Sequence, residues 1–473
     1  MKKQWYSTRH SIFLILTYGL FMTGWNLDYS SASFGEAINI FTGRQILAEN
    51  FDLDSLLNTG SPFVYPPLAA AGDAAGGLIG ARAIGIPFGL LLTWIIYRTG
   101  WLLFSKKQGI LSAIVFLFTG TAVFFSKSAT GDIVAAAFLG LSFYLLLLSE
   151  KNQSGMFLLA GASALFLAFV TKYVVIIYVL SFIFFVLWRV SFSRAVLFFL
   201  LPLSGFLSAY SILILHPSLH DIIESYLMTY QQTPLGVADI TNWKLQWIEL
   251  PYLLAVFGMF HKEKKGEGIM LTLLSAPIFL LYVLNGTEQS IEKNMIFALV
   301  FLAHAAALGV DQMGNLFSYN VTTSWVKPFF TVAVLAVIWV FGVKQTAWFE
   351  QQYPDITPVV EFLKQKGHDH MTLAIDSDDS YQTYVYRYSL EKTFPSARVI
   401  PILRDVNRNR EEIMHLNDPD FLLCNGYNMK TEAHKVPVCS YEQGFSLANE
   451  FRLPFWSGIQ NVNILLKEVG HEM

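Results

Sequence analysis

The sequence predicts a polytopic α-helical membrane protein of about 11 transmembrane helices, followed by a C-terminal extracytoplasmic α/β domain. Two observations predict the membrane part. The 473 residues are 54% hydrophobic and only 14% charged, whereas soluble domains carry about a quarter charged residues. Long apolar runs also recur along residues 1–345 with little sequence between them, as expected where each backbone must satisfy its hydrogen bonds within a helix. A third observation predicts the second domain, because the composition of residues 346–473 is that of a soluble protein.

Eleven apolar runs define the expected spans. Met1–Arg9 and the first run resemble a signal peptide, but no small-residue cleavage site follows, so we interpret the run as an uncleaved first span. Gly72–Gly80 is rich in alanine and glycine, which predicts a bent or broken start to the second span. The expected spans are 11–27, 69–98, 109–126, 131–149, 155–171, 173–188, 195–213, 247–260, 269–284, 294–310 and 328–343.

Lysine and arginine set the expected orientation, because cytoplasmic loops contain them in excess. With the N-terminus inside, thirteen of these residues fall in the inner segments and six in the outer ones. This orientation places the polar loop 28–68, the 127–132 turn, the loops 214–246 and 285–293 and everything after Lys344 on the outer face. The net charge of -3 gives no reason to expect a nucleic-acid partner.

Residues 346–473 alternate between helical and extended patterns. Strands are expected at 371–375, 398–402, 420–424, 445–451 and 461–467, with helices between the first three, which predicts a small α/β layer. The two cysteines, Cys424 and Cys439, fit either a disulfide or two buried thiols. We expect neither a structural metal nor a cofactor. A role of this domain in gating the site or recognising the acceptor is a hypothesis.

Five charged residues lie within or at the ends of apolar runs, where a charge costs about 2.5 to 3.5 kcal/mol on insertion scales. They are Arg82, Lys127, Asp132, Glu292 and Lys293. All fall on the expected outer side, where Asp28 and Glu36 also lie. The sequence leaves two interpretations open: one cluster of carboxylates and cations at a membrane face, or an isolated Lys127–Asp132 pair across a tight turn with a snorkelling Arg82.

The order of several motifs resembles the glycosyltransferase C superfamily, and is most similar to its lipid A aminoarabinose transferases and protein O-mannosyltransferases. The resemblance covers about residues 1–345, with Thr171-Lys172-Tyr173 and Glu292-Lys293-Asn294 where those proteins carry basic residues at span ends. The family's Asp-Glu pair reads Asp28-Tyr29 here, and Tyr65 replaces the lysine that often precedes Pro-Pro. The motifs are Asp28, Gly43, Tyr65-Pro66-Pro67-Leu68, Gly80-Ala81-Arg82 and Ser126-Lys127-Ser128-Ala129-Thr130-Gly131-Asp132.

The resemblance implies a glycosyltransferase of the bacterial inner membrane with its site toward the periplasm. Such an enzyme moves a sugar from a polyprenyl phosphate to lipid A, another glycolipid, a polysaccharide or a protein, with inversion. Asp28 is then the candidate base, Asp132 orients a cation or the acceptor, and Glu36 takes the place of the missing glutamate. The candidate residues for the donor phosphate are Arg82, Lys127, Lys293 and Tyr65.

Other functions fit a polytopic chain as well. A transporter or flippase of lipid-linked sugars would be expected to show internal repeats and charges at the membrane midplane, whereas no repeat is evident here and the charges fall at one face. An O-antigen polymerase or ligase would be expected to use arginines in long outer loops. A non-catalytic scaffold is the remaining alternative.

Overall fold

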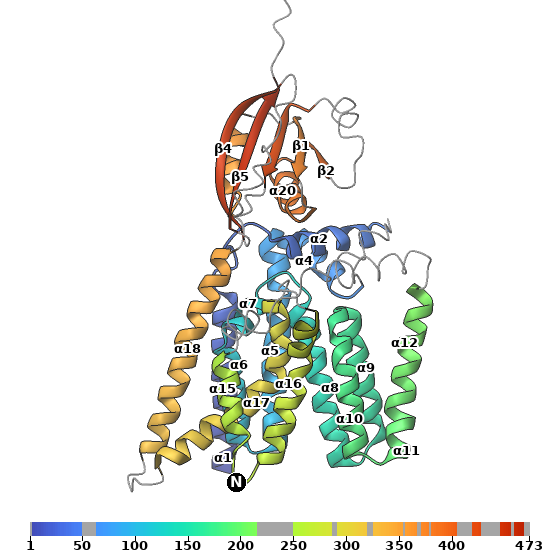
Figure 1. The fold of residues 1–473 in the computed structure, drawn as a ribbon, viewed down its shortest axis with the longest axis vertical. Coiled ribbons are helices and arrows are strands. Elements are labelled where there is room, and N and C mark those ends of the chain that lie inside the picture. Colours follow the sequence, from blue (N-terminus) through green and yellow to red (C-terminus); the bar gives the residue numbers. More distant parts are fainter. Residues whose placement is uncertain are drawn as a thin grey trace, which may run out of the picture. The chain divides into compact units, whose positions relative to one another are not determined.

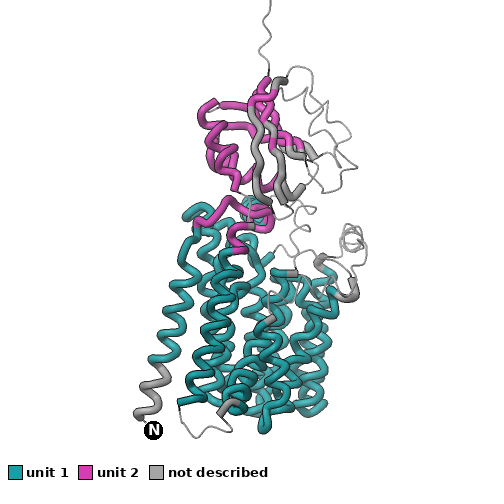
Figure 2. Tube along the Cα trace, turned by 60° about the vertical axis from the view of Figure 1, so that its left-hand side comes forward, with its two compact units in different colours: residues 1–27, 39–347 teal, residues 28–38, 348–473 magenta. Residues whose placement is uncertain are grey.

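The structure is a computed structural model, and it describes most of the chain in two compact units. The described residues are 2–49, 63–214, 249–285, 291–318, 325–352, 355–366, 370–377, 380–403, 419–426, 445–455 and 458–467. Unit 1 comprises residues 1–27 and 39–347, and unit 2 comprises residues 28–38 and 348–473 (Figure 2). The predicted outer loop 214–246 lies outside the described residues after residue 214.

Unit 1 is a bundle of apolar helices. Helix α17 lies at its centre, because it packs against α5, α6, α7, α8, α15 and α16 (Figure 1). Its alanine-rich faces allow close approach, and at Gly309 a Cβ atom would lie only 1.8 Å from the carbonyl oxygen of Leu254. The helices that lie wholly or partly in unit 1 are α1 (Lys2–Gly24), α2 (Phe34–Leu47), α4 (Tyr65–Ala83), α5 (Gly85–Leu103), α6 (Lys106–Leu117), α7 (Gly120–Ser126), α8 (Asp132–Asn152), α9 (Gly155–Thr171), α10 (Ile176–Arg189), α11 (Phe192–Ala195), α12 (Leu201–Ile214), α15 (Glu249–Gly258), α16 (Lys265–Asn285), α17 (Ile291–Ser318) and α18 (Val326–Gln352), with short η1 (Tyr173–Val175) and η2 (Val196–Leu200).

Six helical segments among the described residues are long and apolar enough to cross a membrane. They are Tyr65–Leu103, Asp132–Asn152, Phe192–Ile212, Lys265–Tyr282, Glu292–Leu316 and Val326–Gln351. Shorter apolar helices occupy His10–Gly24, Gly155–Thr171 and Tyr173–Arg189. The chain is therefore a multi-pass membrane protein, as predicted. Each predicted span overlaps an apolar helix, and the total of eleven spans stays a prediction.

Two spans differ from straight helices. The break expected near Gly72–Gly80 is present, because Gly76 and Gly77 leave the helical conformation and Gly77 has φ 64°, which favours glycine. The span expected at 109–126 is instead bent by 70° between α6 and α7. The physical reason lies at Gly120, whose backbone nitrogen donates to Oε1 of Gln345 at 3.2 Å. A Cβ at Gly120 would lie 2.5 Å from the carbonyl oxygen of Gly342, so the bend lets α7 pack closely on α18.

Unit 2 contains a five-stranded sheet in the order β2-β1-β3-β5-β4. Strand β1 pairs in parallel with β2 and β3, while β5 pairs antiparallel with β3 and β4. Alternate residues of the strands, such as Leu373 and Ile375, enter a buried core that also receives α19 and α20, as a period of two requires. The predicted α/β layer is confirmed. Its elements are α19 (Thr357–Lys366), β1 (Thr372–Ser377), α20 (Ser380–Thr393), β2 (Arg398–Leu403), β3 (Phe421–Gly426), β4 (Phe445–Phe455) and β5 (Gly458–Lys467).

The segment 28–38 packs within unit 2, although it is far away in the sequence. Phe34 packs against the core of this unit, and its ring centroid lies 5.9 Å from that of Tyr384. The backbone nitrogen of Ile356 donates to Oγ of Ser31 at 3.1 Å. The predicted division of the chain at residue 345 stays a prediction. Cys424 forms a disulfide, and the chain's other cysteine, Cys439, lies outside the described residues.

Candidate functional site

The turn between α7 and α8 places a carboxylate in the interior of unit 1. Asp132 is the first residue of α8, where the positive end of the helix dipole favours a negative charge. Its side chain is only 2% exposed. The Thr130 hydroxyl donates to this carboxylate and also bonds with the Ser128 hydroxyl at 3.1 Å. The turn therefore holds the Asp132 carboxylate in a fixed position.

Lys172 forms an ion pair with Asp132 from the end of α9. Helix α9 ends at Thr171, and Lys172 takes an extended backbone conformation (φ −154°, ψ 116°) that turns the chain away from the helix. The Lys172 side chain is 23% exposed, so it reaches the edge of the buried region. The pair joins α8 and α9 at one end of the bundle, and one of its partners is accessible from outside.

Two further charges come from the first turn of α17. Lys293 attracts the Asp132 carboxylate, and the buried Glu292 interacts electrostatically with Asp132, Lys172 and Lys293. These four side chains, which we call the Asp132 cluster, contain two acids and two bases. The structure thus gathers Asp132 and Lys293, both predicted from the sequence, with Lys172 and Glu292.

Two buried cations bind the chain where it leaves α1. Nη1 of Arg82 donates to the carbonyl oxygen of Leu27 at 2.8 Å, and Nζ of Lys127 donates to that of Trp25 at 3.2 Å. Arg82 is 0% exposed and Lys127 2% exposed. Both belong to unit 1, and both fix the backbone that immediately precedes Asp28. The structure shows an ion pair between Asp132 and Lys172, which was not predicted from the sequence.

Close packing at Gly131 brings the start of α4 to the same turn. A Cβ atom at Gly131 would lie 3.3 Å from Cβ of Tyr65 and 3.5 Å from the carbonyl oxygen of Thr171. Tyr65 is buried. The first residue of α4, the turn before α8 and the end of α9 therefore converge, and the predicted residue Tyr65 lies beside the backbone that carries Asp132.

Sequence reasoning missed a second buried carboxylate, Asp73 in the first half of α4. Nη2 of Arg44 bonds its Oδ2 at 2.7 Å, while the Arg44 side chain is 39% exposed. The sequence contained a signal for Asp73, because an acid within an apolar run is costly. The same criterion selected the five charged residues of the sequence analysis. Lys172 was noted at a span end, but it was not selected as a site residue.

Asp28 and Glu36, the other two predicted acids, belong to unit 2. Asp28 is exposed. Glu36 is fully buried, and its Oε2 accepts from the Ser33 backbone nitrogen at 3.0 Å while Oγ of Ser33 accepts from the Glu36 nitrogen at 3.3 Å. This reciprocal pattern is a capping box that begins α2. The Tyr29 hydroxyl donates to the other carboxylate oxygen at 3.4 Å. A catalytic role of either acid stays a prediction.

Among the described residues, no three His, Cys, Asp or Glu side chains come together in a group that could hold a metal ion. What the Asp132 cluster offers chemically is a set of fixed opposite charges in a region of low water content. Such a set can bind an anion through lysine N–H groups that are already oriented.

Comparisons with known proteins find one family model and several solved structures that are similar to this chain. Residues 76–215 match the family model described as dolichyl-phosphate-mannose-protein mannosyltransferase. No curated protein is similar to the chain in sequence. Among solved structures, ArnT from Cupriavidus metallidurans bound to undecaprenyl phosphate is 12% identical with a TM-score of 0.58, covering 95% of this chain and 97% of that one.

Two other structures are similar over most of this chain. The Archaeoglobus fulgidus oligosaccharyltransferase in its apo form is 12% identical with a TM-score of 0.54, covering 89% of this chain and 70% of that one. The arabinofuranosyltransferase AftD from Mycobacteria is 11% identical with a TM-score of 0.55, covering 98% of this chain and 40% of that one. These likenesses show the fold. Together with the match of residues 76–215 to the family model, they confirm the predicted resemblance.

Proposed function

We propose that this chain, which has the fold of the glycosyltransferase C superfamily, is a membrane glycosyltransferase that uses a sugar linked to a polyprenyl phosphate. The observation that carries the proposal is the Asp132 cluster, in which Lys172 and Lys293 lie together at one end of the bundle. The similar ArnT structure contains undecaprenyl phosphate. The acceptor is an extracytoplasmic hydroxyl on lipid A, another glycolipid, a polysaccharide or a protein.

We assign binding of the donor phosphate to the cations of the site. Lys172 and Lys293 are only partly buried, so a phosphate can approach them from outside the bundle. Charge-assisted N–H···O bonds are roughly twice as strong as neutral ones, and they gain strength where water is scarce. Arg82 and Lys127 are further candidates, because both are buried cations beside the chain segment that follows α1. Tyr65 remains a candidate through its packing beside Gly131.

Sugar transfer then proceeds as a direct displacement. The acceptor oxygen forms a bond to the anomeric carbon while its proton passes to a carboxylate, and the bond from that carbon to the phosphate oxygen breaks. Its electron pair leaves with the polyprenyl phosphate, so the anomeric configuration inverts. Asp28 is the proposed base, a role worth about 10²- to 10⁴-fold in rate. Asp132 orients Lys172, and Glu36 is a secondary candidate whose carboxylate also caps α2.

We propose that the site and unit 2 face the periplasm of a bacterial inner membrane. The excess of lysine and arginine in the opposite segments supports this orientation. The disulfide at Cys424 supports it independently, because disulfides persist in oxidising compartments and are rare in the cytosol.

The test compares the purified wild type with Asp28→Asn in proteoliposomes that contain a radiolabelled polyprenyl-phosphate sugar and an acceptor extract. We expect the rate of transfer to fall by about 10²- to 10⁴-fold while donor binding is unchanged, since the exposed Asp28 side chain is not a structural support. The matched control is Glu263→Gln, another exposed acid, which should transfer at the wild-type rate. Full transfer by Asp28→Asn would exclude Asp28 as the base, and uptake of the donor without transfer would favour a transporter.

A further inference from the structure

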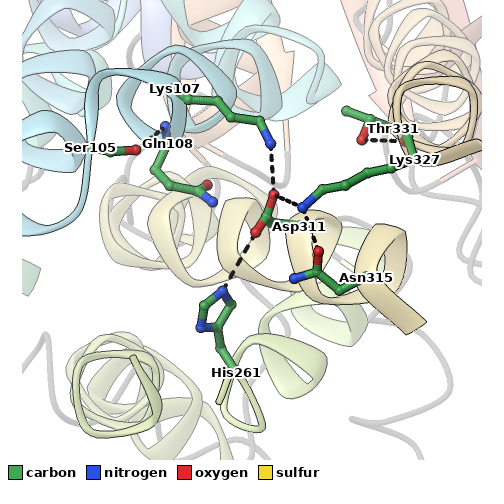
Figure 3. A network of polar contacts seen from close by, with 8 residues as sticks. All are labelled: Ser105, Lys107, Gln108, His261, Asp311, Asn315, Lys327 and Thr331. Atoms are coloured by element: carbon green, nitrogen blue, oxygen red, sulfur yellow. Dashed lines mark hydrogen bonds and ion pairs between the residues drawn. The ribbon is translucent and has the colours of Figure 1, made fainter. Parts of the chain in front are cut away.

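A second charge cluster lies in unit 1, near the other end of α17 (Figure 3). Its centre is Asp311, whose Oδ1 lies 2.8 Å from Nζ of Lys107 and 3.2 Å from Nζ of Lys327. Its Oδ2 lies 3.6 Å from Nε2 of His261. Lys327 also bonds the side chain of Asn315. These residues, which we call the Asp311 cluster, come from the ends of α6, α17 and α18 and the turn after α15 (Figure 3).

The two clusters are separated by about the thickness of a bilayer. Asp311 follows Glu292 by nineteen residues on the continuous helix α17, which corresponds to about 28 Å at 1.5 Å per residue. The hydrocarbon core of a bilayer is about 30 Å thick. The Asp311 cluster is therefore in the leaflet opposite the Asp132 cluster, and it plays no part in the chemistry proposed there.

The Asp311 cluster carries more positive than negative charge. One carboxylate faces two lysines and a histidine. Lys107 is 58% exposed, and among the described residues its ammonium donates only to Asp311. Since an ammonium has three N–H donors, Lys107 has donors available for an anion outside the protein.

Exposed apolar side chains surround these cations. Phe260 precedes His261, Trp325 and Phe329 lie two residues on either side of Lys327, and all three are exposed. The ring centroids of Trp325 and Phe329 lie 6.0 Å apart at the start of α18, a helix that is mostly exposed. Tryptophan is enriched at the membrane–water boundary. The cations therefore lie where a lipid headgroup meets its acyl chains.

We infer that the Asp311 cluster binds the headgroup phosphate of an anionic phospholipid, with Lys107 and Lys327 as its donors. Basic pockets between helix ends bind such headgroups in other membrane proteins. A free phosphate would use the cations but leave the apolar rim formed by Phe260, Trp325 and Phe329 without a partner. An anionic lipid satisfies both, which is why the lipid is the occupant that the geometry favours.

The test measures binding of phosphatidylglycerol to the full-length protein in phosphatidylcholine nanodiscs, by native mass spectrometry. The variant Lys107→Ala/Lys327→Ala should bind it about 25-fold more weakly, at about fivefold per lysine near a membrane surface. The matched control is Lys151→Ala/Arg194→Ala, which removes one cation from the last turn of α8 and one from α11 and should bind normally. Equal losses in the two double variants would refute a specific site.

Three further measurements separate binding from a purely structural role. Lys107→Arg/Lys327→Arg, which keeps both charges, should bind within threefold of the wild type. Asp311→Asn should bind phosphatidylglycerol at least as tightly as the wild type, because it frees both lysines. A loss of binding in Asp311→Asn, or displacement of the lipid by an equal concentration of inorganic phosphate, would overturn the inference.

Discussion

The Lys172–Asp132 ion pair allows a prediction in which the two single substitutions have unequal effects. Lys172→Met leaves the Asp132 and Glu292 carboxylates, both buried, with Lys293 as the remaining cation of the cluster. Breaking a buried pair in this way costs about 3 to 5 kcal/mol of unfolding free energy. Asp132→Asn leaves Lys172 without its partner, but this side chain is already 23% exposed and can turn toward water.

The expected cost of Asp132→Asn is therefore smaller, about 1 to 3 kcal/mol, which is the range for a buried polar group that loses one bond. The double variant Lys172→Met/Asp132→Asn should be more stable than the sum of the single effects predicts, because neither charge is left alone. The free energies of unfolding of the two single variants and the double variant are measured by denaturant unfolding in one preparation of mixed micelles. The rate of sugar transfer is measured for the same three variants.

The order of the two single variants decides the outcome. If Asp132→Asn destabilises the protein as much as Lys172→Met or more, the pair is not organised around a buried carboxylate. Additive single effects would show that the two side chains do not interact. The rate of sugar transfer should be reduced in both single variants. Lys172→Met loses a hydrogen-bond donor to the phosphate, and Asp132→Asn loses the carboxylate that orients Lys172.

Two further substitutions test the packing around the site. Gly43→Ala should destabilise unit 1 by about 1 to 3 kcal/mol, because its Cβ would lie 1.9 Å from the carbonyl oxygen of Pro66. The control Gly205→Ala has open space around its Cβ and should be neutral or stabilising. Both effects are measured by thermal unfolding. Ser33→Ala should cost about 0.5 to 2 kcal/mol by removing the cap of α2, and Glu36→Gln should cost less because the amide oxygen still accepts a hydrogen bond. Equal stability of Ser33→Ala and the wild type would show that the capping box does not stabilise the protein.

Several parts of the fold could be predicted because they depend on local chemistry. The apolar spans follow from the requirement that a backbone in lipid bonds to itself. The break in α4 follows from Gly76 and Gly77, and Gly77 adopts a positive φ that other residues avoid. The α/β layer of unit 2 follows from strand and helix periods in the sequence.

Other features depend on contacts between distant residues. The ion pair of Lys172 with Asp132 depends on how α9 packs on α8, which no local pattern encodes. The assignment of segment 28–38 to unit 2 depends on Phe34 and Ser31 meeting residues more than 300 positions away.

The sequence by itself determined that this protein is a multi-pass helical bundle with a separate α/β unit, and it identified most of the charged residues whose position in lipid is costly. Only the tertiary structure decided which of these charges meet. Burial cost is a property of one residue in its own segment, so it can be read along the chain. An ion pair is a property of two segments, and its partners are fixed only when the helices that carry them have packed.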